Sequence, residues 1–246
     1  MYYLVECLLI KNENQYLLEH LRDNVQAGIE HFYIYDNNSD VSVEKFLSDY
    51  PDLQKLCTVE IFPDSENKQI DCYKHFLDTH RNDSIYCAFV DTDEMFEGDL
   101  KELLKTERTV YTFRSITHGS NGKAFYEDKT LKERFYTDTK PLFSYVKNIV
   151  KLSDLITQLP HESICINNDK CIVSRKDVKL HHYYYKSFEE FLWKIKRGVI
   201  QKKTVRILKY FFTNNNNLLS EKDIKAVLNK YNVDLNFKTI KNGREK

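Results

Sequence analysis

The stretch Ser84-Ile85-Tyr86-Cys87-Ala88-Phe89-Val90-Asp91-Thr92-Asp93-Glu94 decides the fold of this chain. Its first seven residues are mostly apolar, with aromatic and branched side chains, which is typical of a strand buried on both faces. Asp91 and Asp93 follow where this strand ends. In open α/β sheets, ligands bind beyond the carboxyl ends of the strands. Two carboxylates at that position suit a divalent cation that also holds phosphate oxygens.

Outward from this stretch, apolar strands alternate with amphipathic helices. The expected strands cover residues 2–10, 31–35, 57–62, 84–90 and 109–113. The expected helices include one that ends at Gly28, one that Ser39 or Asp40 caps before Pro51, one over 66–81 that buries Ile70, Tyr73, Phe76 and Leu77, and one over 99–105. Such alternation predicts an α/β fold with a parallel, doubly wound sheet.

Polar clusters follow three of the expected strands. They are Lys11-Asn12-Glu13, the run from Asp36 to Asp40, and the run from Asp91 to Glu94. Right-handed crossovers bring the carboxyl ends of parallel strands to one edge of the sheet. We therefore expect all three clusters at a single site.

Composition and charge exclude several classes of function. The 246 residues include 37 Lys+Arg and 37 Asp+Glu, so net charge gives no reason to expect a nucleic-acid partner. Six cysteines without a CxxC pattern indicate a reduced, cytoplasmic protein with neither zinc site nor disulfide framework. The N-terminus lacks the features of a signal peptide, and no apolar run is long enough to span a membrane.

After residue 113 the pattern becomes irregular. Residues 165–173 suggest a hairpin, a helix is expected from about Ser187, and the basic residues from about 202 suggest two short helices and a frayed tail. We expect one domain over 1–198, with a regular half (1–113) and an irregular half (114–198). Residues 199–246 would be a basic helical extension.

Several motifs, taken in order, resemble the family-2-like glycosyltransferases of GT-A fold, in particular the bacterial branch related to glycosyltransferase family 92. The residues that carry the resemblance are Lys11-Asn12-Glu13, Tyr16-Leu17-Leu18-Glu19, Gly28, Phe32 to Asp40, Gln69, Asp91 to Phe96, Glu133-Arg134-Phe135, His182-Tyr183 and Lys186-Ser187. His20 stands where that group usually has tryptophan, and the histidine that the group usually has near Asn24 is not found here. The resemblance ends near residue 198.

The resemblance implies a GT-A fold, with a Rossmann-like and mostly parallel sheet. It implies that residues 1–113 form the nucleotide-sugar-binding half and that residues 114–198 form the irregular acceptor half. It also implies a Mn²⁺ or Mg²⁺ site. We expect Asp93 to bind the ion, and Asp91 to bind the donor ribose or a metal-bound water. A late histidine is the expected third ligand. Strand alternation lets only one of His181 and His182 face the site, and the resemblance favours His182.

Further residues are expected to contact the donor or the acceptor. Asn12, Glu13 and Asp36 would hold the nucleoside, and Arg134 and Lys186 would hold the diphosphate. Each also has an ordinary structural interpretation, as a helix cap, a turn or an ion pair. An inverting reaction needs a carboxylate base for the acceptor hydroxyl. Glu133 is the expected base, with Glu162, Glu94 and Asp154 as rivals.

The resemblance implies transfer of a hexose from a nucleotide-diphosphate sugar, expected to be a UDP-sugar, to a glycan or glycolipid. It also implies a setting in bacterial surface polysaccharide or lipooligosaccharide synthesis. The basic tail would contact the inner face of the membrane. One alternative is a sugar-nucleotide nucleotidyltransferase, against which the absence of glycine in residues 11–15 counts. Another is a non-catalytic domain that binds glycan or a partner.

Overall fold

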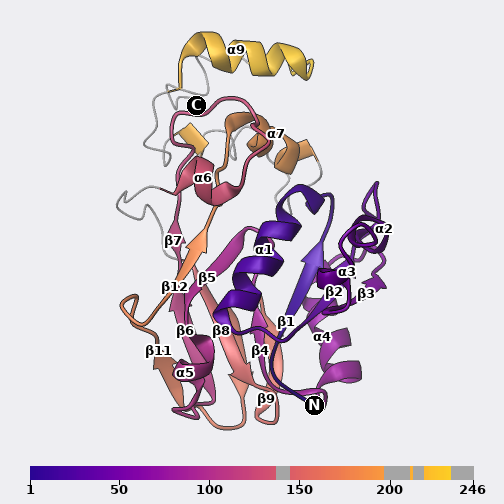
Figure 1. The fold of residues 1–246 in the computed structure, drawn as a ribbon, viewed down its shortest axis with the longest axis vertical. Coiled ribbons are helices and arrows are strands. Elements are labelled where there is room, and N and C mark those ends of the chain that lie inside the picture. Colours follow the sequence, from indigo (N-terminus) through magenta and orange to yellow (C-terminus); the bar gives the residue numbers. More distant parts are fainter. Residues whose placement is uncertain (137–144, 197–210, 213–218, 234–246) are drawn as a thin grey trace. The chain divides into compact units, whose positions relative to one another are not determined.

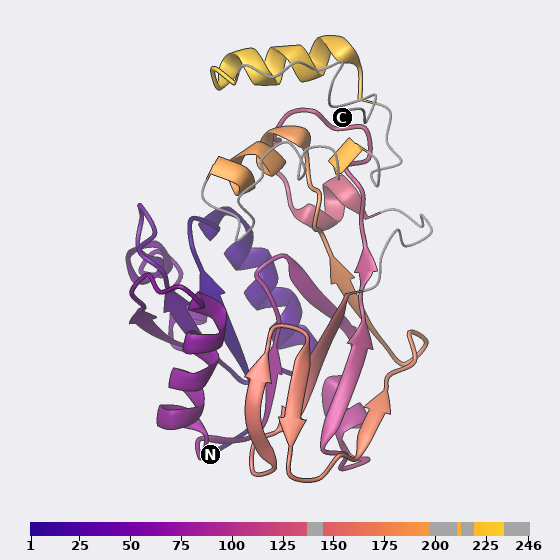
Figure 2. The ribbon, with the colours of Figure 1, turned by 180° about the vertical axis from the view of Figure 1, so that it is seen from behind.

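The computed structural model describes residues 1–136, 145–196, 211–212 and 219–233 (Figures 1 and 2). The chain forms two compact units. The first comprises Met1–Ile116 and Phe143–His182, and the second comprises Thr117–Leu142 and Tyr183–Lys246. Residue 198, where the sequence predicts the end of the domain, lies within the second unit. The predicted domain boundary stays a prediction.

The first unit is built on a seven-stranded sheet in the order β11-β6-β8-β4-β1-β2-β3. These strands are β1 (Tyr2–Ile10), β2 (His31–Asp36), β3 (Cys57–Ile61), β4 (Ser84–Phe89), β6 (Val110–Arg114), β8 (Val146–Lys151) and β11 (Lys170–Ile172). β1 runs parallel to β2 and β4, β2 to β3, and β11 to β6. Only β8 is antiparallel to its neighbours β4 and β6. The predicted α/β class is confirmed, with a central and mostly parallel sheet.

Helices cover both faces of this sheet. They are α1 (Asn14–Ala27), α2 (Val43–Leu47), α3 (Pro51–Gln54), α4 (Lys68–His80) and α5 (Leu100–Leu104). Alternate residues of β1 belong to different cores: Leu4 and Leu8 cluster with residues of α1 and α5, whereas Val5 and Cys7 cluster with residues of α4. This period-2 alternation is what a strand buried on both faces requires.

Some local predictions for the first unit are wrong. The N-cap of α2 is Ser42, whose hydroxyl accepts from the Lys45 amide, and neither Ser39 nor Asp40 has this role. Ile70 is exposed. Residues 165–173 form no hairpin, because β10 (Glu162–Cys165) pairs with β9 (Leu155–Leu159) while β11 pairs with β6.

A smaller sheet has the order β5-β12-β7, with β5 (Glu94–Gly98), β12 (Val178–His182) and β7 (Ile116–Thr117). β5 was not predicted, and it starts directly after Asp91-Thr92-Asp93. It pairs antiparallel with β12, in a register that sets His182 opposite Glu94 and His181 opposite Met95. The last residue of the acidic motif and the late histidines are therefore neighbours in one sheet.

The second unit contains α6 (Leu131–Phe135), α7 (Phe188–Lys196) and α9 (Glu221–Lys230). Apolar side chains of α7 and α9 share one buried cluster, which includes Phe191, Leu192, Val227 and Leu228. The indole N–H of Trp193 donates to the hydroxyl of Tyr231 at 2.8 Å. α9 is one of the predicted tail helices, and much of the remaining predicted tail lies outside the described residues. Within the part of the chain that the structure describes, no helix has the length and apolarity to cross a membrane.

Candidate active site

The loops after β1 and β2 are joined by hydrogen bonds at the carboxyl edge of the main sheet. The Asn12 amide donates to Ser39 Oγ at 2.9 Å, and the Asp40 amide donates to Asn12 Oδ1 at 2.8 Å. Asn12 has a φ of 51°, in the left-handed region that asparagine tolerates better than most residues. β1 is parallel to both β2 and β4, so the expectation that three polar clusters share one edge is confirmed.

The residues predicted to hold the nucleoside lie in or beside these loops. Asp36 is buried, and its two carboxylate oxygens accept from the amides of Ser39 and Val43, each at 2.9 Å. Glu13 is buried at the N-cap position of α1 and makes no side-chain cap. Asp36 and Asn12 thus organise the edge, and nucleoside contacts by Asn12, Glu13 and Asp36 stay predictions.

Asp91 is held from two sides at the end of β4. Its Oδ1 accepts from Gln69 Nε2 at 2.9 Å, and its Oδ2 accepts from Lys147 Nζ at 2.8 Å. Burial opposes the ionised carboxylate, but the Lys147 ammonium outweighs it and keeps the Asp91 pKa below its ordinary value. The side chain remains 43% exposed. Asp91 is therefore an ionised, fixed carboxylate with open surface.

Lys147, on β8, is the main site residue that the sequence did not reveal. Its side chain is only 1% exposed, and its ammonium also lies 3.3 Å from Glu94 Oε2. Burial lowers the Lys147 pKa, but Asp91 and Glu94 together raise it above its ordinary value, so the ammonium stays charged. Gln69 was noted for the resemblance without a role, and the structure gives it one as a donor to Asp91.

Asp93, Glu94 and His182 form a buried group beside Lys147. His182 Nε2 lies 3.5 Å from Asp93 Oδ1, and His182 Nδ1 lies 3.3 Å from Glu94 Oε1. Burial raises the Glu94 pKa to about 8, although Lys147 acts in the opposite direction. His181 faces elsewhere, with Nε2 3.1 Å from Glu97 Oε2. Of the two late histidines, the one beside Asp93 is His182.

These side chains fit a cation that a substrate helps to bind. Among the described residues, no three His, Cys, Asp or Glu side chains are gathered closely enough to form a complete metal site. Asp93 and His182 nevertheless offer one oxygen and one nitrogen 3.5 Å apart. Adjacent ligands of one ion, each about 2.1 Å from it, are separated by about 3 Å. A small adjustment would let both bind one ion.

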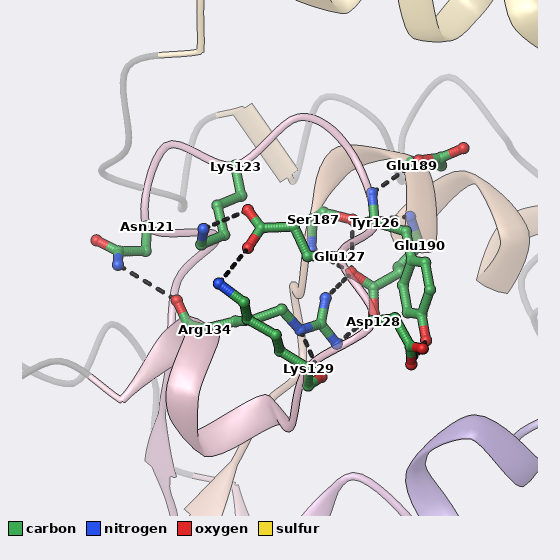
Figure 3. Close-up of polar contacts among 10 residues, drawn as sticks. All are labelled: Asn121, Lys123, Tyr126, Glu127, Asp128, Lys129, Arg134, Ser187, Glu189 and Glu190. Carbon is green, nitrogen blue, oxygen red and sulfur yellow. Dashed lines mark hydrogen bonds and ion pairs between the residues drawn. The ribbon is translucent and has the colours of Figure 1, made fainter.

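The remaining predicted residues lie in the second unit, except Glu162 and Asp154. Arg134 is buried, and its Nη1 and Nη2 donate to Glu190 at 2.7 and 3.0 Å while its Nε donates to the Lys129 carbonyl at 3.0 Å (Figure 3). Lys186 is also buried and has a φ of 53°. Diphosphate binding by Arg134 and Lys186 stays a prediction, and Arg134 has the ion pair that its structural interpretation requires.

Glu133, the predicted base, is exposed and caps α6. Its Oε2 accepts from the Thr130 amide at 2.9 Å and from the Thr130 hydroxyl at 2.7 Å, as part of a capping box. These hydrogen bonds hold the Glu133 pKa below its ordinary value, which makes the carboxylate a weaker base. Of its rivals, Glu162 is exposed, Asp154 accepts from Thr109 Oγ1 at 3.4 Å, and Glu94 belongs to the buried group.

Comparison with solved structures finds distant likenesses. The chain is similar to "S. aureus TarS 1-349", with 12% identity and a TM-score of 0.47, over 96% of this chain and 76% of that one. A second S. aureus TarS structure matches with 14% identity and a TM-score of 0.47, over 96% and 44%. A putative glucose-1-phosphate thymidylyltransferase from Bacillus anthracis, in complex with a sucrose, matches with 12% identity and a TM-score of 0.35, over 97% and 99%.

Sequence comparison is more decisive than these structural likenesses. No curated protein matches the chain. Residues 4–235, however, match the family described as glycosyltransferase family 92. The match extends past residue 198, so the resemblance covers more of the C-terminal part than predicted. The chain belongs to glycosyltransferase family 92.

Proposed function

We propose that this glycosyltransferase is metal-dependent and transfers a hexose from a nucleotide-diphosphate sugar, a UDP-sugar, to a glycan or glycolipid. One observation carries the proposal. Asp93 and His182 meet at the carboxyl edge of the sheet, in a group with three carboxylates, Asp91, Asp93 and Glu94, and one ammonium, that of Lys147. The carboxylates outnumber the ammonium in this group, and that excess suits a divalent cation.

Asp93 and His182 would hold Mn²⁺ or Mg²⁺. Such an ion, when bound, supplies Lewis-acid stabilisation of the leaving diphosphate. The chain's own residues do the rest. Lys147 and Gln69 orient Asp91, whose open surface suits a ribose hydroxyl or an ion-bound water. The joined loops of Asn12 and Asp36 form the adjacent edge on which the nucleoside would lie.

The acceptor side is proposed in less detail. We infer an inverting reaction, in which a carboxylate takes the proton from the acceptor hydroxyl. Glu133 remains the residue predicted for that step, although its capping box supports the structural interpretation. A Glu133→Gln variant separates the two: loss of transfer with donor hydrolysis retained would support the catalytic role. Unchanged transfer would leave the helix cap as its function.

The setting we propose is bacterial surface polysaccharide or lipooligosaccharide synthesis at the inner face of the membrane, with the basic C-terminal residues in contact with anionic lipid. Sedimentation with anionic and neutral vesicles tests this part. Binding that requires anionic lipid and weakens with salt supports it, and absence of binding to either vesicle contradicts it.

The central experiment is a donor-hydrolysis screen across nucleotide sugars with Mn²⁺, run for the wild type and for Asp93→Ala. We expect the wild type to hydrolyse one UDP-sugar slowly, and Asp93→Ala to lose this activity. Glu97→Gln is a matched control, because Glu97 lies on β5, which begins directly after Asp93, and its carboxylate contacts His181. Full turnover by Asp93→Ala would show that the metal assignment is wrong.

A further inference from the structure

Behind the proposed cation ligands lies a layer of buried polar contacts. Lys147 Nζ contacts Asp91 Oδ2 at 2.8 Å and Glu94 Oε2 at 3.3 Å. The second oxygen of Glu94 lies 3.3 Å from His182 Nδ1. The amide of Asp91 also donates to Glu94 Oε2 at 2.9 Å. One lysine and one glutamate thus connect the residues that face the substrate edge.

Burying these charged side chains contributes little to the stability of the fold. The Glu94 side chain is 0% exposed and that of Lys147 is 1% exposed. Buried ion pairs recover little beyond their desolvation cost, and apolar side chains of similar volume often serve stability as well or better. Two carboxylates against one ammonium are still less favourable. A role in ligand binding explains why these charged side chains are buried here, whereas packing does not explain it.

The geometry at His182 specifies that role. A cation bound at Nε2 requires the ring proton to lie on Nδ1, and ligating histidines usually donate that proton to a carboxylate or carbonyl. Nε2 faces Asp93 Oδ1, and Nδ1 faces Glu94 Oε1. Since β5 and β12 pair with Glu94 opposite His182, the backbone register holds the two side chains together.

We propose that Glu94 and Lys147 are positioning residues. Glu94 fixes the orientation and tautomer of His182 for cation binding, and Lys147 holds the carboxylates of Glu94 and Asp91 in place. This inference rests on the proposed function, because it requires a cation at Asp93 and His182. The inference adds Glu94 and Lys147 to the site, as residues that position the ion's ligands without binding the ion.

The chain contains a matched control for this proposal. His181 Nε2 lies 3.1 Å from Glu97 Oε2, which makes a second carboxylate–histidine pair on the same two strands. Glu97 is 39% exposed and also accepts from Lys179 Nζ at 2.6 Å. Because His181 and His182 are consecutive in β12, their side chains point to opposite faces. Only the Glu94 pair lies beside Asp93.

The test measures binding of Mn²⁺ with UDP by calorimetry, for the wild type, Glu94→Gln, Glu94→Asp and Glu97→Gln. We expect Glu94→Gln to weaken Mn²⁺ binding by about 10- to 100-fold, Glu94→Asp to weaken it less, and Glu97→Gln to leave it unchanged. Lys147→Met should weaken binding of both Mn²⁺ and UDP. Far-UV circular dichroism and thermal melting establish that each variant is folded.

A double-mutant cycle separates positioning from a general structural effect. His182→Asn should weaken Mn²⁺ binding, and adding Glu94→Gln to it should cause little further loss, because Glu94 acts through His182. Additive losses would overturn the inference, as would unchanged Mn²⁺ affinity in folded Glu94→Gln. A wild type that binds no Mn²⁺ with UDP would overturn the proposed function, and this inference with it.

Discussion

Two buried charged groups, one in each compact unit, contrast with each other. In the second unit, Arg134 Nη1 and Nη2 donate to Glu190 as a bidentate pair (Figure 3). The third guanidinium nitrogen, Nε, donates to the Lys129 carbonyl, and Glu190 Oε2 also accepts from the Ser187 amide at 3.1 Å. In the first unit, the Lys147 ammonium contacts both Asp91 and Glu94, while Asp93 and Glu94 each lie beside His182. In the Arg134–Glu190 pair, one positive charge matches one negative charge. An excess of carboxylates indicates a place for a cation.

The contrast also separates two kinds of consequence. Removing a charge from the balanced pair should lower stability, because its partner is left buried and unpaired. Removing a carboxylate from the acidic group should lower activity with little loss of stability, because repulsion among the carboxylates is relieved. The following variants test this distinction.

The largest expected effect is on catalysis. Asp93→Asn should reduce donor turnover by about 10³-fold or more, since a bound cation contributes several kcal/mol to the transition state. Its urea midpoint should equal that of the wild type or exceed it. Turnover is measured with the donor identified by the hydrolysis screen, beside Glu97→Gln. An Asp93→Asn protein that is inactive only because it is unfolded would remove the distinction between the two groups.

Breaking the balanced pair should have the next largest effect. Arg134→Met should lower the free energy of unfolding of the second unit by about 3–5 kcal/mol, because Glu190 is left without its cation. Trp193, the single tryptophan, lies in this unit and reports its unfolding by fluorescence in urea. The double variant Arg134→Met/Glu190→Leu should recover part of the loss. A double variant that is no more stable than Arg134→Met would contradict the pairing.

Binding of Mn²⁺ and UDP should raise the stability of the folded protein only when the acidic group is intact. With UDP present, Mn²⁺ at about 100 times its dissociation constant should add about 2.7 kcal/mol to the stability of the wild type. The gain should vanish in Asp93→Asn and after chelation with EDTA, and it should persist in Glu133→Gln. Thermal melting with and without Mn²⁺ measures it. An equal gain in Asp93→Asn would place the cation elsewhere.

The smallest effect concerns Asp36. Its carboxylate accepts from the amides of Ser39 and Val43, so Asp36→Ala should lower stability by about 1 kcal/mol, as loss of a helix or turn cap does. If Asp36 also contacts the nucleoside, Asp36→Ala should weaken UDP binding by more than the fraction of protein that its lower stability unfolds. Urea titration and calorimetry on the same preparation distinguish the two roles. Unchanged stability would contradict the capping role.

Much of the first unit could be predicted from its sequence, because local patterns control it. The apolar runs of β1 and β4 and the helix that ends at Gly28 appear where they are expected, and Gly28 has the left-handed φ of 117° that its C-cap role requires. The polar ends of parallel strands then meet at one edge by topology. These features are short-range, or follow from a rule about chain crossovers.

The parts that were missed depend on long-range pairing. Lys147 comes to Asp91 because β8 inserts antiparallel between β4 and β6, and no local pattern indicates that insertion. β5 could not be recognised from the sequence, because it begins directly after the acidic motif. The ion-pair partner of Arg134, Glu190, is distant in sequence, so no local pattern could identify it. The sequence shows which side chains are charged, but the fold determines which of them pair.

The most direct test of this account is calorimetric titration of UDP into the wild type and into Asp93→Asn, each with Mn²⁺ and with EDTA. We expect UDP to bind the wild type only when Mn²⁺ is present, and to bind Asp93→Asn with equally low affinity in both conditions. UDP binding that is equally tight with Mn²⁺ and with EDTA, or tight Mn²⁺-dependent binding by Asp93→Asn, would contradict the central claim that Asp93 serves a cation-dependent donor site.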